Sequence, residues 1–596
     1  MVLLILTLLF LVRGNSIGDC MAEVQNNVGQ KFIFAYAENY RPNADPSVIV
    51  TNMSPLDHAV VAITITTPVH GLIKTVTLQG WGNSEQVTLP RELVPVSPDF
   101  DMVAIIVQAN DSVTVYAIND AHEYSMDGFT VLPVSSLGTE YFVASYTPLF
   151  QSQIVIVATK DNTEVEVELS NTVTYKNREV EGGNIILIDA KGYDATLLRG
   201  GTDLTGTRVR SNHPIAVLSG NRCTRVPVDV DSFDHLMEML PPFSQWGRQF
   251  VVMPFLGRST GVIYRVISGR DNTEITVNSK MMRLQKEQYL EFEVGVGQSD
   301  FVESNNPVQV VQYAKGLHAD NVIGDPAMTI VPPMEQSIQT AWLPTYNTTK
   351  VLQTVQNYVN IYAPCTEMYY GNLTMDGMVL RDIVPADRIV RIDSSAYCGV
   401  GLYLTHGVHD IGPAAQGRES FVAIAYGFAE RNAFAWPVGL GTRAITCLYR
   451  GQDGVQLEHD CSKALVIQHI PCNASETVDV DECVNVDCVP NEYVIYISAG
   501  VAVGAIILSK LFSVCVIQRT KTPKQLAFGQ AGVVSPPPDI AVHHGSDEDL
   551  VIEKAATATS LRPPSPHAPR RSFRSERADR MRRSSRSPSP APSSFA

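Results

Sequence analysis

The sequence predicts an all-β protein built from tandem repeats, followed by one transmembrane helix and a disordered tail. From Gly29 onward, short runs rich in Val, Ile, Tyr, Phe and Thr are broken every eight to twelve residues by Asn, Asp, Gly, Pro or Ser, which is typical of strands and turns. A motif recurs every 109 residues, at Gly29, Gly138 and Gly247. A single long apolar stretch, residues 494–517, separates two regions of opposite charge.

The chain begins with a segment that is typical of a secretory signal peptide. Residues 1–12 are almost entirely apolar, and Arg13 and small residues follow. This layout predicts a signal peptide over residues 1–16, with cleavage near Gly14 to Ser16. The basic residues that normally precede the apolar core are missing, so a retained anchor is the alternative.

The repeats open with similar nine-residue strings, GQKFIFAYA, GTEYFVASY and GRQFVVMPF. Repeats two and three also share Asp-Asn-Thr-Glu, at Asp161 and at Asp271, where the first two residue types favour a hairpin corner. A degenerate fourth repeat ends near Phe428. The predicted ectodomain, residues 17–440, contains repeats at about 29–137, 138–246, 247–335 and 336–440. Repeats of this size fit β-sandwiches, and a toroid or propeller with two four-stranded blades per repeat is the alternative.

Several motifs in the ectodomain occur in an order that resembles a known family. They are ASYTP (144–148), DLTGTRVRSNHPIAVLSGNRC (203–223), DHLMEMLPP (234–242), WGRQFVV (246–252) and GDPAMTIVPP (324–333). Together they resemble the N-terminal region of the IgG Fc-binding protein family of mucus, over about residues 28–440. The resemblance implies an extracellular, mucosal binding region, but no binding residue can be transferred position by position.

One departure from this family concerns a cysteine. The family usually has a second cysteine just before the DHL motif, where this chain has Phe233. The resemblance therefore implies that Cys223 is unpaired.

The sequons and most cysteines precede the apolar stretch, as expected for an oxidising, glycosylating compartment. The predicted glycosylation sites are Asn52, Asn110, Asn347, Asn372 and Asn473. Cys365 and Cys398 flank a β segment and are the favoured disulfide pair in the ectodomain. Disulfides would also stiffen a membrane-proximal stalk over residues 441–492, although their connectivity stays open. Its cysteines are Cys447, Cys461, Cys472, Cys483 and Cys488.

The apolar stretch Val494 to Ile517 predicts a membrane-spanning helix, within a segment of residues 493–517. A helix of this length would be about 36 Å long, against a hydrocarbon core of about 30 Å. Acidic residues precede the stretch and Arg519, Lys521 and Lys524 follow it, which predicts a single-pass type I protein of the plasma membrane with an extracellular N-terminus and a cytoplasmic C-terminus. Gly500 and Gly504 form a G-x-x-x-G that would permit a homodimer.

The tail, residues 518–596, is rich in Pro, Ser and Arg and is predicted to be disordered. Arg-Arg-Ser sequences make Ser572 and Ser584 candidate phosphorylation sites. The tail carries a net charge of +6, against −22 for the rest of the chain. An acidic ectodomain argues against nucleic acid as a partner.

Motifs for catalysis are missing from the sequence. His235 and Glu238 would place two metal ligands on one face of a helix, but a third clear ligand is lacking. We therefore expect no enzyme activity, no cofactor and no metal.

The predicted function is binding of an extracellular glycoprotein, immunoglobulin-Fc-like or mucin-like, in mucosal defence or adhesion. One alternative is a self-associating, matrix-organising membrane protein in which Cys223 links two chains. Another is an ectoenzyme on a propeller scaffold.

Overall fold

The computed structural model describes residues 26–442, apart from residues 43, 56–58, 97–101, 122–124, 347–353 and 415–418, and five short strands beyond them. The chain divides into two compact units, Met1–Lys554 and Ala555–Ala596, and every element named below belongs to the first. Nearly all of these elements are strands, which confirms the all-β prediction. The predicted signal peptide and transmembrane helix lie outside the described residues. Within the described part, no helix is long and apolar enough to cross a membrane.

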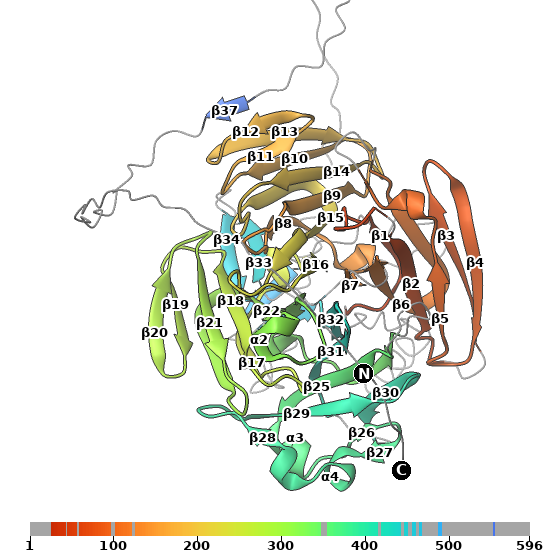
Figure 1. The fold of residues 1–596 in the computed structure, drawn as a ribbon, viewed down its shortest axis with the longest axis vertical. Helices are drawn as coiled ribbons and strands as arrows, with labels where there is room; N and C mark the ends of the chain where they lie inside the picture. The colour runs from red at the N-terminus through yellow and green to blue at the C-terminus, as the bar shows by residue number, and fades with distance from the viewer. Residues whose placement is uncertain are drawn as a thin grey trace, which may run out of the picture. The chain divides into compact units, whose positions relative to one another are not determined.

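The strands between residues 29 and 438 form four lobes around a central group of strands (Figure 1). Lobe 1 contains β1 (Gly29–Phe34), β2 (Asp45–Asn52), β3 (Val60–Thr67), β4 (Gly71–Gln79), β5 (Ser84–Thr88), η1 (Arg91–Leu93), β6 (Ile105–Asp120), β7 (Met126–Val131) and η2 (Val134–Ser136). Lobe 2 contains β8 (Gly138–Phe142), β9 (Ser152–Ala158), β10 (Thr163–Glu168), β11 (Val173–Tyr175), β12 (Arg178–Val180), β13 (Asn184–Ala190), β14 (Ala195–Gly200), β15 (Arg208–Arg225), β16 (Phe233–Met239) and η3 (Phe243–Gln245).

Lobe 3 contains β17 (Gly247–Val252), β18 (Val262–Ser268), β19 (Thr273–Val277), β20 (Lys280–Leu284), β21 (Tyr289–Val294), β22 (Asp300–Ala314), α2 (Leu317–Asp320), β23 (Ala327–Val331) and η4 (Met334–Gln336). Lobe 4 contains β24 (Ala341–Pro344), β25 (Gln356–Pro364), α3 (Cys365–Tyr369), β26 (Leu373–Met375), β27 (Met378–Val379), α4 (Leu380–Ile383), η5 (Ala386–Arg388), β28 (Val390–Arg391), β29 (Tyr397–Leu404), β30 (Val408–Pro413), β31 (Val422–Ala429) and β32 (Asn432–Val438). The remaining strands are β33 (Thr446–Arg450), β34 (Gln456–Asp460), β35 (Ala464–Ile467), β36 (Asp487–Pro490) and β37 (Ile552–Lys554), and β37 pairs with β13.

Each lobe consists of two layers that share one long strand. In lobe 1 the first half of β6 pairs with β1 and β3, and its second half pairs with β2 and β7. Strands β4 and β5 extend the two layers to four strands each. Lobe 3 has the same connections with β22 as the long strand, and lobe 2 has them with β15 and an added β11–β12 hairpin. In lobe 4 the long strand is divided into β30 and β31.

The last strand of each lobe lies at the centre. Strands β7, β16, β23 and β32 are neighbours in this order, and β32 also lies against β7. The four hydrophobic clusters follow the same cycle, because each includes side chains from two successive lobes. In the cluster that joins lobe 4 to lobe 1, the rings of Trp436 and Tyr116 lie 5.4 Å apart. The hydrophobic core therefore lies across the boundaries between lobes as well as within them.

A circle of hydrogen bonds closes the centre after the last strands. Gln245 Nε2 donates to the backbone oxygen of Ser136 (2.6 Å), and Gln336 Nε2 donates to that of Gln245 (3.0 Å). The backbone N–H of Gly441 donates to the oxygen of Gln336 (2.9 Å), and the hydroxyls of Thr442 and Ser136 are 2.7 Å apart. We call residues 26–442 the ring, and the end of the central strands with this circle the closure side.

The two ends of the ring meet at the closure side. The backbone N–H of Asn27 donates to the oxygen of Leu440 (2.9 Å), and Asn26 forms an isolated β-bridge with Gly441. The Thr442 hydroxyl also donates to the oxygen of Asn26 (3.2 Å). Lobe 4 therefore completes a cycle that begins with lobe 1.

The recurring glycine of the sequence motif begins the first strand of lobes 1 to 3, where it packs against a proline. A Cβ atom added at Gly29, Gly138 or Gly247 would lie 2.4, 2.5 or 2.2 Å from the Cβ atom of Pro133, Pro242 or Pro333. Such distances are too short for any side chain. The motif thus marks the place where the first strand of a lobe crosses the segment after its last strand.

The Asp-Asn corners differ from the prediction in one respect. Asn162 and Asn272 have φ angles of 57° and 54°, as expected for a tight corner. However, β9 and β10 pair with β15 and not with each other, and β18 and β19 likewise pair with β22. The corners therefore connect the two layers of a lobe and are not hairpins.

Candidate binding surface

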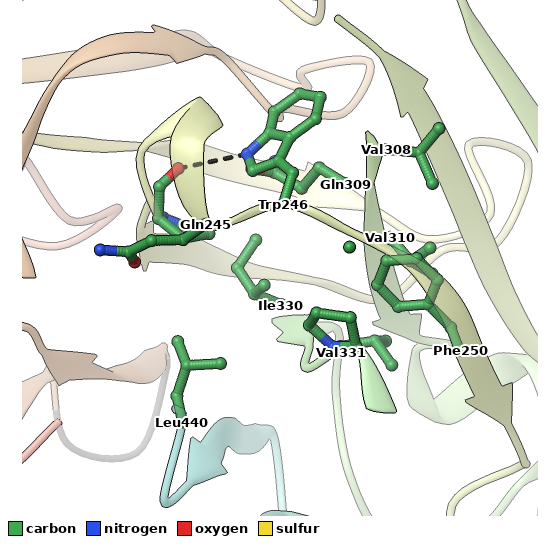
Figure 2. Close-up of a pocket in the computed structure, with 12 residues that line it drawn as sticks. Gln245, Trp246, Phe250, Val308, Gln309, Val310, Ile330, Val331 and Leu440 are labelled. Atoms are coloured by element: carbon green, nitrogen blue, oxygen red, sulfur yellow. Dashed lines mark hydrogen bonds between the residues drawn. The ribbon is translucent and has the colours of Figure 1, made fainter. Parts of the chain in front are cut away.

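A small cavity lies beside Trp246 near the closure side (Figure 2). Apolar side chains such as Phe250, Ile330 and Leu440 line it, and its volume is about 10 Å³. Such a volume holds about one water molecule. The cavity is therefore too small for a ligand, and because it is lined almost wholly by apolar groups it offers few polar partners. Recognition of a large ligand needs an exposed surface instead.

The centre of the ring contains a carboxylate that joins all four central strands. Asp127 of β7 accepts hydrogen bonds from the backbone N–H groups of Gly128 (2.8 Å), Met237 (3.1 Å) and Met328 (3.4 Å). The N–H of Ala435 is a fourth donor. These donors belong to β7, β16, β23 and β32. In each strand the donor comes earlier in the chain than the residues that reach the closure side. The central strands therefore run in one direction, and we call their starting end the loop side.

Three more carboxyl groups are buried near Asp127. Asp234 Oδ1 accepts from the N–H groups of Met126 (2.8 Å) and His235 (2.7 Å), and Glu238 Oε1 accepts from that of Ile330 (3.3 Å). Asp234 Oδ2 and Glu238 Oε2 are buried without a partner. Asp325, before β23, accepts from the N–H of Leu317 (3.4 Å).

Burial controls the ionisation of this group, because a charged carboxylate loses its hydration in the protein interior. It raises the pKa of Asp127, Asp234 and Glu238 well above their usual range, and it raises the pKa of Asp325 to about 7. The negative charge of Asp325 raises the pKa of Asp234 further, and that of Asp127 raises the pKa of Glu238. Asp127 was not predicted from the sequence, although an acidic residue beside the apolar run GFTVL is a signal that could have identified it.

The structure corrects the interpretation of His235 and Glu238 as residues on a helical face. Both residues lie in the strand β16, where positions three apart point to opposite faces. The two ring nitrogens of His235 lie 3.2 Å from Asn119 Nδ2 and 3.4 Å from the oxygen of Arg222. Burial lowers the pKa of His235 to about 4. Among the residues described, no group of three His, Cys, Asp or Glu side chains could hold a metal ion.

A cluster of three aromatic rings, one exposed and two partly buried, lies on the loop side, where lobes 1 and 2 meet. The ring of Tyr40, which follows β1, lies 5.3 Å from the rings of Phe150 and Phe233. Phe150 comes from the segment between β8 and β9, and Phe233 is the first residue of β16. Phe150 is 47% exposed. We call these three residues the aromatic patch.

Ion pairs and hydrogen bonds hold the segments that carry the aromatic patch. The buried carboxylate of Glu38 pairs with Arg199 (3.2 Å) and Arg222 (3.1 Å), which connects lobe 1 to lobe 2. The backbone N–H groups of Leu149 and Phe150 donate to the oxygen of Cys223 (3.0 and 3.2 Å). The guanidinium group of Arg41 lies 4.7 Å from the centre of the Tyr40 ring. These contacts therefore connect the segments that carry the patch to lobes 1 and 2.

The predicted glycosylation sites have different surroundings. Asn110 and Asn372 are exposed, whereas Asn52 is fully buried and its amide binds the backbone. Asn347 and Asn473 lie outside the described residues. The predicted phosphorylation sites, Ser572 and Ser584, also lie outside them.

The cysteines also have different surroundings. Cys365 and Cys398 form a disulfide, and Cys223 is a buried free thiol. Cys447 and Cys488 lie in β33 and β36, while Cys461, Cys472 and Cys483 fall outside the described residues. Burial raises the pKa of the Cys223 thiol, which keeps it protonated.

Comparisons with known proteins give one family. The family model described as IgGFc binding protein matches residues 127–427, about half of the chain. The human protein named IgGFc-binding protein is 23% identical over 455 residues. This alignment covers 74% of the chain but only 8% of the human protein.

Solved structures resemble the chain only weakly. Trypsin-activated alpha-2-macroglobulin from Escherichia coli is 8% identical, with a TM-score of 0.11 over 72% of this chain and 42% of that protein. The BSP domain of a biofilm associated protein is also 8% identical, with a TM-score of 0.12 over 70% of this chain and 96% of that domain. Neither similarity bears on the fold of the ring.

Proposed function

Because the chain belongs to the IgGFc-binding protein family, we propose that it is a single-pass type I membrane glycoprotein of the cell surface whose ring binds an extracellular glycoprotein. The name of the human relative gives IgG Fc as the ligand of that protein. For this chain the proposed ligands are an immunoglobulin-Fc-like or a mucin-like glycoprotein. The proposed activity is binding and not catalysis.

The observation that carries this proposal is the aromatic patch. Large aromatic side chains are enriched at the centres of protein interfaces, because they combine a large apolar area with few rotatable bonds. Tyr40, Phe150 and Phe233 come from two lobes, which the ion pair between Glu38 and Arg199 connects. They also lie at the opposite end of the central strands from the ends of the ring. The patch therefore lies on the side of the ring that is opposite to Asn26 and Thr442.

The linking of two chains through Cys223 has little support. Its sulfur is buried, so a disulfide between chains would first require the ring to open. We therefore base no function on this thiol.

The test is binding of fluorescent IgG Fc and of mucin glycoprotein to cells that display the full chain. We expect the double variant Phe150→Ser and Phe233→Ser to bind at least tenfold more weakly, as is usual for central interface residues. Leu187→Ser is the matched control, since Leu187 of β13 is also 47% exposed but lies outside the patch. If the patch variant bound as strongly as the unaltered chain, the binding site would have to lie outside the patch. If the unaltered chain bound neither protein, both proposed ligands would be excluded.

The same cells test the proposed topology. The structure pairs β37 of the tail with β13, whereas a type I topology places these two strands on opposite sides of the membrane. An epitope tag after residue 596 should therefore be stained only in permeabilised cells. Staining of intact cells would support the strand pairing and exclude the type I topology.

A further inference from the structure

The segments that carry the aromatic patch on lobe 2 continue directly into the buried carboxyl groups. Phe233 of the patch precedes Asp234, whose Oδ1 atom is bound to the backbone of Met126 at the start of β7. A movement of the Asp234 carboxyl group would thus be passed to the Phe233 ring through one peptide unit.

Asp325 belongs to the second segment that supports this region. The segment of residues 315–326 lies against residues 226–232, just before Phe233. The N–H of Gly316 donates to the oxygen of Val226 (2.9 Å), and that of His318 donates to Ser232 Oγ (2.8 Å). His318 Nδ1 also lies 2.7 Å from the oxygen of Asp231. The position of the loop before the patch therefore depends on the segment that holds Asp325.

Asp234 and Asp325 have different charged neighbours. Asp234 faces Asp325, Asp127 and the Cys223 thiol, and its hydrogen-bond donors are the Ser125 hydroxyl and backbone N–H groups. Asp325 faces Arg258, His318 and Arg431. Arg258 is already engaged by Asp320 at 2.9 Å. Two buried carboxylates that repel each other cannot both ionise at low cost.

We propose that Asp234 and Asp325 connect the protonation of the ring centre to the aromatic patch, so that the loops carrying the patch are held more firmly at mildly acidic pH than above neutral pH. This regulation rests on the proposed function of the patch, but it is a property of the ring that can be measured without any ligand.

The direction of this pH dependence follows from the protonation of Asp234 and Asp325 in the closed and open forms. Burial raises the pKa of Asp325 to about 7 and that of Asp234 well above its usual range. The folded state therefore binds more protons than the unfolded or locally opened state between the ordinary carboxyl pKa of about 4 and the raised value. Across this interval the closed form loses stability as the pH rises. Each additional proton changes the ratio of closed to open forms about tenfold per pH unit.

The experiment is hydrogen exchange of the full chain in detergent micelles at pH 5.5, 6.5 and 7.5, corrected for the intrinsic pH dependence of exchange. We expect the protection of residues 226–233 and 315–326 to fall severalfold to tenfold per pH unit. In the double variant Asp234→Asn and Asp325→Asn this dependence should become much weaker, because both carboxyl groups, whose pKa values are raised, are gone. Asp229→Asn is the control, since Asp229 is exposed in the same loop and should leave the dependence unchanged.

Three results would overturn the proposal: protection of the two segments that does not change with pH in the unaltered chain, a dependence that survives undiminished in the double variant, or its loss in Asp229→Asn. If the double variant fails to fold, Asp325→Asn replaces it and should show a weaker dependence than the unaltered chain, which still decides the first outcome. A chain with pH-dependent loops that binds neither glycoprotein would contradict the proposed function and leave this inference intact.

Discussion

The amide of Asn52 replaces backbone partners that are missing at the end of β2. Its Nδ2 atom donates to the oxygen of Gly80 (2.9 Å), and its Oδ1 atom accepts from the N–H of Ser54 (2.9 Å). The side chain is fully buried. Pro55 follows the sequon of Asn52 and makes it the weakest of the five predicted sites, but the sequence does not show that the side chain is buried. Burial of Asn52 depends on the pairing of β2 with both β5 and β6.

We therefore expect the folded protein to carry no glycan at Asn52, because a glycan on its amide would remove these bonds and could not fit into the core. Glycopeptide mass spectrometry of the full chain should find glycan at Asn110 and Asn372 and none at Asn52. Both exposed sites serve as internal controls. An occupied Asn52 in folded material would show that β2 has different surroundings from those described above.

At the level of strands and turns, the glycine of the motif allows the first strand of a lobe to lie close to a proline. Gly138 lies at the start of β8, and a Cβ atom there would collide with Pro242. We expect Gly138→Ala to lower the free energy of unfolding by about 1–3 kcal/mol, the usual cost of overpacking. The tryptophan fluorescence of the chain can measure this, since all four tryptophans, Trp81, Trp246, Trp342 and Trp436, belong to the ring.

The matched control for this substitution is Gly201→Ala. Gly201 has nothing within 4 Å of an added Cβ atom, so this change should have little effect on unfolding. If Gly138→Ala were equally harmless, the first strand of lobe 2 would not need to lie close to Pro242.

The positions of the strands were more predictable from the sequence than their pairing partners. Alternation of β-branched and aromatic residues with turn residues depends on local sequence, and it indicated the strands correctly. The φ angles of Asn162 and Asn272 followed from the same local chemistry. The partner of each strand was not predictable, because β9 and β10 would show the same apolar pattern in a hairpin as they do on opposite layers. The grouping of the buried carboxyl side chains was not predicted for a related reason, since three of the four strands that donate to Asp127 are distant from it in sequence.

For the molecule as a whole, the cycle of shared hydrophobic clusters implies that the lobes depend on one another. Trp436 of β32 is fully buried and stacks on Phe434 at 4.1 Å, while its ring also lies beside Tyr116 of lobe 1. We expect Trp436→Ala to destabilise the ring by about 3–5 kcal/mol. Because each cluster spans two lobes, the loss should lower the protection of all four lobes in hydrogen exchange.

Trp81→Ala is the control for this substitution, because Trp81 is 42% exposed and should cost less. Unchanged protection of lobes 2 and 3 in the Trp436→Ala variant would contradict this expectation, since it would mean that the lobes unfold independently.

The sequence period could reveal that similar segments follow one another, but not that the last returns to the first. Closure depends on Asn26, Gly441 and Thr442, three small or polar residues that have no distinctive pattern. Apolar side chains at the boundaries between lobes also look the same in a row of separate domains as they do in a cycle. Only the arrangement in space distinguishes these two possibilities.

The meeting of Asn26 with Gly441 has one more consequence. A ring whose first and last residues lie side by side tolerates circular permutation well, because a short linker can join the old ends while new ends are cut at an exposed turn. For the same reason the ring can be inserted into a host protein as a cassette, at the cost of one surface loop. A gene segment that encodes it could thus move between chains of different organisation without any change in the ring itself.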